Sequence, residues 1–218
     1  MRPAVATAVL GVALAVAAPT TWVLTRPAAT AGAPVQQSLG APSSPEAASA
    51  EPGDLFTVTA RPAAPATAEQ RPVPVRLTVP ERGVDAVIDA VGVQPDGQMT
   101  LPADVDRVGW YRFGPEPGAD GSAVIAGHVD DRVQGLGAMA PLREAEVGDE
   151  IVVTGSAGTA TRWRVVSREL IQKQALPLER LFAREGPPRL TLITCGGPFL
   201  PEIGSYRDNV VVVAEPLP

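Results

Sequence analysis

Beyond residue 71 the hydrophobic residues fall in short runs separated by turn signals, a pattern typical of β-strands. Val75–Val79 alternates apolar and polar positions, whereas Ser122–His128 is apolar almost throughout and predicts a buried strand. Pro95-Asp96-Gly97 is a strong turn signal between two of the runs. The predicted strands are 75–79, 84–93, 99–101, 122–128, 150–154, 160–171, 190–194 and 210–214.

Two short helices, 138–144 and 178–183, are predicted within long connections. Seven or eight strands with so little helix predict an all-β domain. A closed or nearly closed barrel is expected, because closure removes the exposed strand edges that invite aggregation.

Composition divides the chain of 218 residues into three segments. Residues 1–25 form an uncharged apolar stretch after Arg2, long enough to cross a hydrocarbon core of about 30 Å as a helix. A membrane anchor is expected there, with a cleaved signal peptide as the alternative, and either one exports the rest of the chain. Residues 26–70 are rich in Pro, Ala, Ser and Thr and predict a disordered stalk. Residues 71–218 are enough for one folded domain.

The charge balance argues against a nucleic-acid partner. The chain has 24 acidic and 18 basic residues, a net charge of −6, and no basic tract. It contains one cysteine and one histidine, so no intramolecular disulfide can form.

The lone cysteine and the lone histidine each follow an apolar run. Cys195 comes between a predicted strand and Gly196-Gly197, where the backbone can turn sharply and a substrate can approach. His128 ends another predicted strand. A thiol becomes a nucleophile as the thiolate, and imidazole exchanges protons near neutral pH, so the two residues could form one catalytic pair. Taken singly, each is more often a structural residue.

A third candidate is Arg207, which precedes the valine run 210–213 and is separated from Cys195 by one loop. A guanidinium stays charged and can stabilise an oxyanion that forms on an acyl carbon. Among many arginines, a solvated charge at a strand end is the commoner explanation.

These motifs together resemble the sortases. The cysteine lies in Thr191-Leu192-Ile193-Thr194-Cys195, the histidine in Ala126-Gly127-His128-Val129-Asp130, and the arginine in Tyr206-Arg207-Asp208-Asn209. The span 71–218 is most similar to the class F sortases of actinobacteria, and the anchor and stalk fit that family's usual layout.

The resemblance implies a sortase catalytic domain over 71–218, on an eight-stranded β-barrel. It implies a cysteine transpeptidase that cleaves sorting signals of the LPXTG type between Thr and Gly. Cys195 would be the nucleophile, His128 the general acid and base, and Arg207 the oxyanion stabiliser, with Thr194 a weaker candidate for substrate binding.

The partners implied are LPXTG-type surface proteins as substrate and a peptidoglycan precursor amine as acceptor, with water as the hydrolytic alternative. The location implied is the cell membrane, with a single pass and an extracellular catalytic domain. No cofactor and no metal site are expected.

Two other interpretations remain open. An L,D-transpeptidase is also an exported cysteine acyl-transferase, but its Ser-x-Gly-Cys type motif is missing around Cys195. A surface-displayed binding module is the alternative from a different class, with Cys195 packed in the core or forming an intermolecular disulfide.

Overall fold

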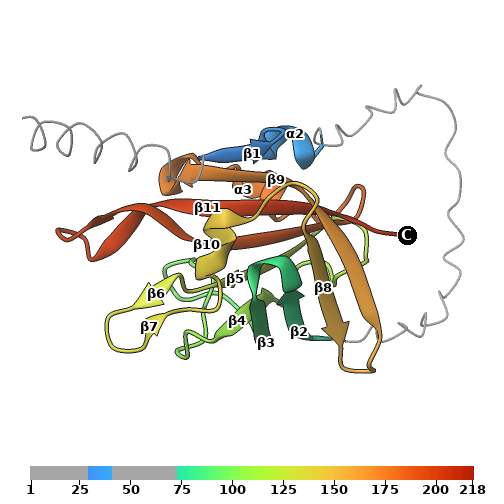
Figure 1. Ribbon diagram of the computed structural model, residues 1–218, viewed down its shortest axis with the longest axis horizontal. Helices are drawn as coiled ribbons and strands as arrows, with labels where there is room; N and C mark the ends of the chain where they lie inside the picture. Colours follow the sequence, from blue (N-terminus) through green and yellow to red (C-terminus); the bar gives the residue numbers. More distant parts are fainter. Residues whose placement is uncertain (1–28, 41–72) are drawn as a thin grey trace, which may run out of the picture.

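The computed structural model describes residues 29–40 and 73–218, and within them a closed β-barrel dominates (Figure 1). The elements are β1 (Thr30–Gly32), α2 (Val35–Ser38), β2 (Pro74–Val79), β3 (Val84–Val91), β4 (Arg107–Tyr111), β5 (Ser122–Gly127), β6 (Asp130–Asp131), β7 (Gly135–Leu136), β8 (Glu150–Gly155), β9 (Ala160–Gln172), α3 (Leu178–Leu181), β10 (Arg189–Leu200) and β11 (Ser205–Pro216). Three short 3-10 helices are η1 (Pro80–Arg82), η2 (Ala140–Glu144) and η3 (Lys173–Ala175).

Eight of the strands close the barrel. Their order is β9-β11-β10-β5-β4-β3-β2-β8, and β8 pairs back with β9. Two neighbouring pairs are parallel, β3 with β4 and β5 with β10, while the other pairs are antiparallel. The prediction of a closed eight-stranded β-barrel with short helices in its connections is therefore confirmed.

The barrel interior is filled by alternating side chains of these strands, as the binary pattern requires. Leu77, Ile125, Trp163, Leu192 and Val212 all belong to this core, and each is buried. Val211 and Val213 point the other way and join a second cluster on the outside of the barrel, together with Val35 and Leu181.

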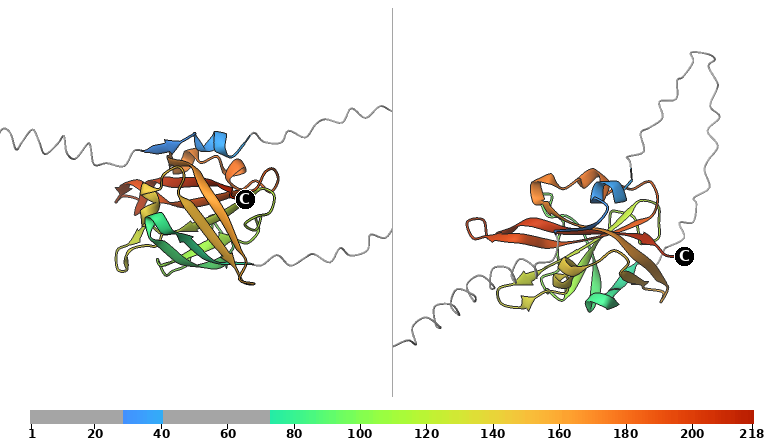
Figure 2. Two further views of the ribbon diagram at one scale, coloured as in Figure 1. Left: turned by 45° about the vertical axis from the view of Figure 1, so that its right-hand side comes forward. Right: turned by 45° about the horizontal axis from the view of Figure 1, so that its top comes forward.

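The second cluster includes residues that the sequence places in the stalk. Within 26–70, predicted to be disordered, β1 pairs with β9 and Val35 of α2 is fully buried against the outer face. Figure 2 shows this segment lying along β9, outside the barrel. The structure differs from the prediction here because one valine and a strand edge are enough to dock a segment without a regular apolar period.

The anchor predicted over residues 1–25 lies outside the described residues. Across 29–40 and 73–218, no helix combines the length and apolar character that crossing a membrane requires.

Candidate active site

The register of β5 and β10 points the lone histidine and the lone cysteine toward the same edge of the sheet. The parallel pairing runs from Arg189 opposite Ser122 to Ile193 opposite Ala126. Two further residues along each chain are Cys195 and His128. Adjacent strands lie about 4.8 Å apart, so Cys195 inside β10 and His128 just after β5 continue from this pairing at the same edge of the sheet.

Both side chains also belong to the outer face of the barrel. Ile125 on β5 and Leu192 on β10 face the barrel core. Side chains alternate between faces, so the outward set on β5 leads to His128 and the outward set on β10 leads to Cys195. Each of the two is partly exposed, and Cys195 is a free thiol.

Thr194 ties the two strand ends together. Its hydroxyl donates a hydrogen bond to the carbonyl oxygen of Gly127 at 2.9 Å, and the side chain is 2% exposed. The substrate-binding role expected of Thr194 stays a prediction, and the structure shows a buried hydroxyl that already donates to the backbone. The bond joins the residues immediately before Cys195 and His128.

The imidazole of His128 is fixed by the connection between β3 and β4. Its Nε2 lies 3.1 Å from the carbonyl oxygen of Pro102. A carbonyl oxygen only accepts, so Nε2 carries a proton and Nδ1 of the neutral ring is the free base. The turn that follows His128 in the chain is tied to the same connection by Gln134, whose side chain donates to the carbonyl oxygen of Ala103.

Strand β10 continues past the predicted end at Thr194. Cys195 pairs with Asn209 of β11, and the pairing is interrupted by a bulge between Gly196 and Phe199. Gly197 in this bulge has φ +71°, a left-handed conformation that favours glycine. The β10–β11 hairpin, coloured red, then projects beyond the barrel (Figure 1).

Arg207 lies on β11 opposite this bulge, in the strand that pairs directly with the cysteine strand. Its guanidinium forms two hydrogen bonds with the carboxylate of the next residue, Asp208. The hydrogen bond to Asp208 raises the pKa of Arg207 above its usual value. Arg207 therefore stays cationic at the edge where Cys195 and His128 lie.

Tyr206 links β11 to the turn after His128, and this role was not predicted from the sequence. Its hydroxyl donates a short hydrogen bond to Asp130, two residues after His128, and its ring packs edge-to-face on Phe199 at 5.3 Å between centroids. The hydrogen bond to Asp130, followed by burial, raises the pKa of Tyr206. Tyr206 thus joins the arginine strand to the histidine turn. The one feature of the sequence that could have indicated this role is the position of Tyr206 next to Arg207.

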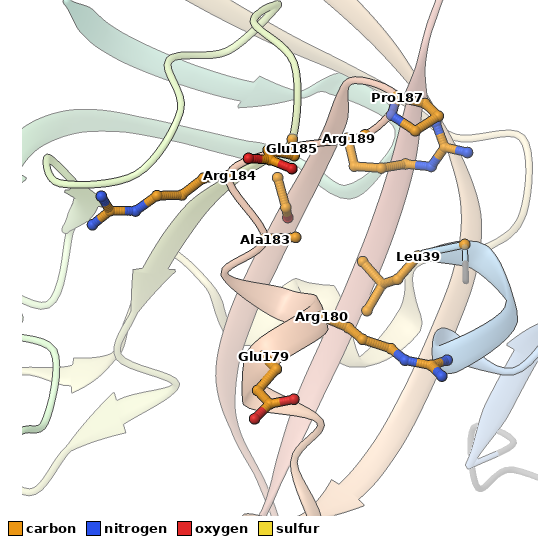
Figure 3. A pocket seen from close by; sticks show the side chains of 12 residues that line it. Leu39, Glu179, Arg180, Ala183, Arg184, Glu185, Pro187 and Arg189 are labelled. Atoms are coloured by element: carbon orange, nitrogen blue, oxygen red, sulfur yellow. The ribbon is translucent and has the colours of Figure 1, made fainter. Parts of the chain in front are cut away.

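The pocket in Figure 3 lies at the other end of the same strands. It has a volume of about 470 Å³ and is lined by residues of α3, of the loop that follows it and of the segment after α2, together with Ser122 and Arg189. Arg189 begins β10, six residues before Cys195, and this separation is about 20 Å along a strand. The pocket is not the site of Cys195 chemistry.

No cluster of three or more His, Cys, Asp or Glu side chains able to hold a metal ion occurs in the described ranges.

A free thiol, an imidazole and a cationic guanidinium at one edge of a closed β-barrel define a candidate cysteine acyl-transferase by their chemistry. A family model described as a sortase domain matches residues 77–217, and the chain belongs to the sortase family.

Solved structures agree in fold. Sortase A from Corynebacterium diphtheriae is similar with a TM-score of 0.51 and 19% identity, covering 68% of this chain and 62% of that one. Sortase C-1 from Actinomyces oris has a TM-score of 0.51 and 21% identity, covering 66% and 71%. A sortase D5 transpeptidase from Clostridium perfringens has a TM-score of 0.50 and 19% identity, covering 67% and 79%.

The matched region thus spans less than two thirds of the C. diphtheriae sortase A chain. No curated protein matches this chain.

Proposed function

We propose that this protein is a cysteine transpeptidase that cleaves LPXTG-type sorting signals between Thr and Gly and transfers the acyl part to an amine. The family match over residues 77–217 carries the proposal. It is supported by the parallel register of β5 and β10 and by the hydrogen bond from Thr194 to Gly127, which join the segments leading to Cys195 and His128. The same match favours a sortase over an L,D-transpeptidase or a binding module.

In the first half of the reaction, the Cys195 thiolate attacks the carbonyl carbon of the substrate Thr. The C=O electron pair moves to oxygen, and the guanidinium of Arg207 stabilises the resulting oxyanion by hydrogen bonds. The oxyanion collapses, the C–N bond to Gly breaks, and protonated His128 gives its proton to the departing amine. The products are a thioester on Cys195 and a free amino-terminal Gly peptide.

In the second half, an acceptor amine attacks the thioester carbon while neutral His128 takes its proton. Collapse of the second oxyanion breaks the C–S bond and restores the thiolate. Splitting the exchange in two lets one site handle both amines. A peptidoglycan precursor amine is the acceptor we propose, and water in its place gives hydrolysis.

The location follows from the predicted anchor. Residues 1–25 would hold the enzyme in the cell membrane by a single pass, with the barrel on the outside near LPXTG-type surface proteins. The similarity of the motifs to class F sortases of actinobacteria supports this placement, and we propose class F as the subgroup.

The test compares the full-length chain with its Cys195→Ala variant on an LPXTG peptide, with and without a glycine-based amine. Loss of the nucleophile should lower cleavage at least about 10³-fold. Thermal unfolding of both chains checks that the barrel is intact. Equal cleavage by the variant would rule out the mechanism.

A further inference from the structure

The side chain of Arg207 forms a bidentate ion pair with the next residue, Asp208, which adjacent residues of a regular strand cannot form. Its Nε lies 2.8 Å from Oδ1 of Asp208 and its Nη2 lies 2.9 Å from Oδ2. Adjacent residues of a regular strand point to opposite faces. The bulge opposite Arg207 bends the hairpin locally, and this lets the two side chains meet.

The two partners differ in exposure. The side chain of Arg207 is 47% exposed, whereas that of Asp208 is 2% exposed. A buried carboxylate has lost its water and needs donors, so the guanidinium satisfies it. The buried carboxylate is therefore held in place by the fold, and the exposed guanidinium is anchored to it by two hydrogen bonds.

The carboxylate of Asp208 occupies the space that a side chain at Gly197 of β10 would fill. A Cβ added to Gly197 would lie 2.2 Å from Oδ2 of Asp208 and 2.8 Å from its Cγ. Gly197 is two residues after Cys195, about 7 Å along a strand. The guanidinium bound to this carboxylate is thus kept beside the backbone that immediately follows the nucleophile.

We propose that Asp208 is a positioning residue that holds the guanidinium of Arg207 beside Cys195, in the space that Gly197 leaves open. The pairing uses Nε and one Nη of the fork, so the remaining N–H donors are directed away from the carboxylate and are free for an oxyanion. Donors fixed in advance need no reorganisation when charge develops, which is the condition for strong oxyanion stabilisation. This role rests on the proposed function.

Two variants of the full-length chain disturb the ion pair between Asp208 and Arg207 in different ways. Asp208→Asn removes the charge and one acceptor at nearly constant volume, and Gly197→Ala displaces the carboxylate. Each should lower kcat for peptide cleavage about tenfold, since a charge-assisted bond to the guanidinium is lost, with KM changed less than about twofold.

Each variant has a matched control. Asp89 pairs with Arg107 through both oxygens in the same way, but on β3 and β4, so Asp89→Asn should leave kcat within about twofold. Gly204 is also a positive-φ glycine of the β10–β11 hairpin, with no atom within 4 Å of an added Cβ. Gly204→Ala should likewise keep kcat.

A cycle with Arg207 separates positioning from general structure. In an Arg207→Ala background, Asp208→Asn should lower the residual kcat by less than about twofold, because there is no guanidinium left to place. Unchanged or raised kcat in Asp208→Asn alone would overturn the proposal, and so would an undiminished tenfold loss in the Arg207→Ala background.

An NMR measurement keeps the proposal testable if the chain cleaves no peptide, which would defeat the proposed function alone. The Nε–H of Arg207, assigned by its loss in Arg207→Lys, should exchange with solvent slowly in the wild type and in Asp89→Asn. It should exchange at least about tenfold faster in Asp208→Asn and Gly197→Ala. Equal exchange rates of this N–H in all four chains would contradict the hydrogen bond between Arg207 and Asp208.

Discussion

Val35 holds the segment Thr30–Ser38 against the outer face of the barrel, and replacing it by alanine should destabilise the protein. The side chain is fully buried in a cluster with Leu181, Val211 and Val213. Val35→Ala removes two carbon groups, worth about 1.6 kcal/mol at ~0.8 kcal/mol each, and the cavity left behind adds to this. We expect a loss of about 2 kcal/mol in the free energy of unfolding.

The assay is thermal denaturation of the full-length chain. For a domain of this size, about 2 kcal/mol corresponds to a fall in Tm of roughly 4–8 °C. Gln37→Ala in the same helix is the control, since its side chain is exposed and the change should stay within about 0.5 kcal/mol. Equal Tm values for Val35→Ala and Gln37→Ala would refute the conclusion that this segment is part of the folded domain.

The remaining predictions concern two groups whose pKa values differ from their usual ranges. Tyr206→Phe should cost about 1 kcal/mol near pH 8 by removing the bond to Asp130. The pKa of Tyr206 is raised in the fold, so this stabilisation is lost as pH rises through the native value, and urea unfolding near pH 11 should show a smaller difference. For Asp149, burial opposes the charged form, but hydrogen bonds from Arg82 and from the Glu146 N–H outweigh it and lower the pKa. Its stabilisation is full at neutral pH and is lost as pH falls through the native pKa. Asp149→Asn should therefore cost about 3 kcal/mol at pH 7 and progressively less as the solution becomes acidic, and a cost independent of pH would contradict the ion pair.

Much of the barrel could be predicted because its strands are short apolar or alternating runs bounded by turn signals. The predicted run 160–171 compares with Ala160–Gln172 in the structure, and 150–154 compares with Glu150–Gly155. Strand Arg107–Tyr111 was not predicted, because it has only five residues, a glycine at its centre, and buries three positions in succession. The predicted return strand at 99–101 is reduced to a single bridge between Val93 and Met99.

The chemistry of the candidate site was accessible from residue types, whereas its geometry was not. Cys195 and His128 could be selected as candidates because the chain has only one cysteine and one histidine. The register that aligns them depends on pairing between strands more than 60 positions apart, as does the bond from Thr194 to Gly127. Likewise, nothing local in Gly197 indicates that Asp208 fills the space beside it.

The central claim is that Cys195 forms a thioester with the acyl part of a sorting signal. The most direct measurement is mass spectrometry of the full-length chain after incubation with an LPXTG peptide in the absence of an amine. We predict a mass increase equal to the peptide up to its Thr less one water, located on Cys195, absent in Cys195→Ala and discharged when a glycine-based amine is added. Peptide cleavage without any adduct on Cys195, or an adduct that persists in Cys195→Ala, would contradict the account.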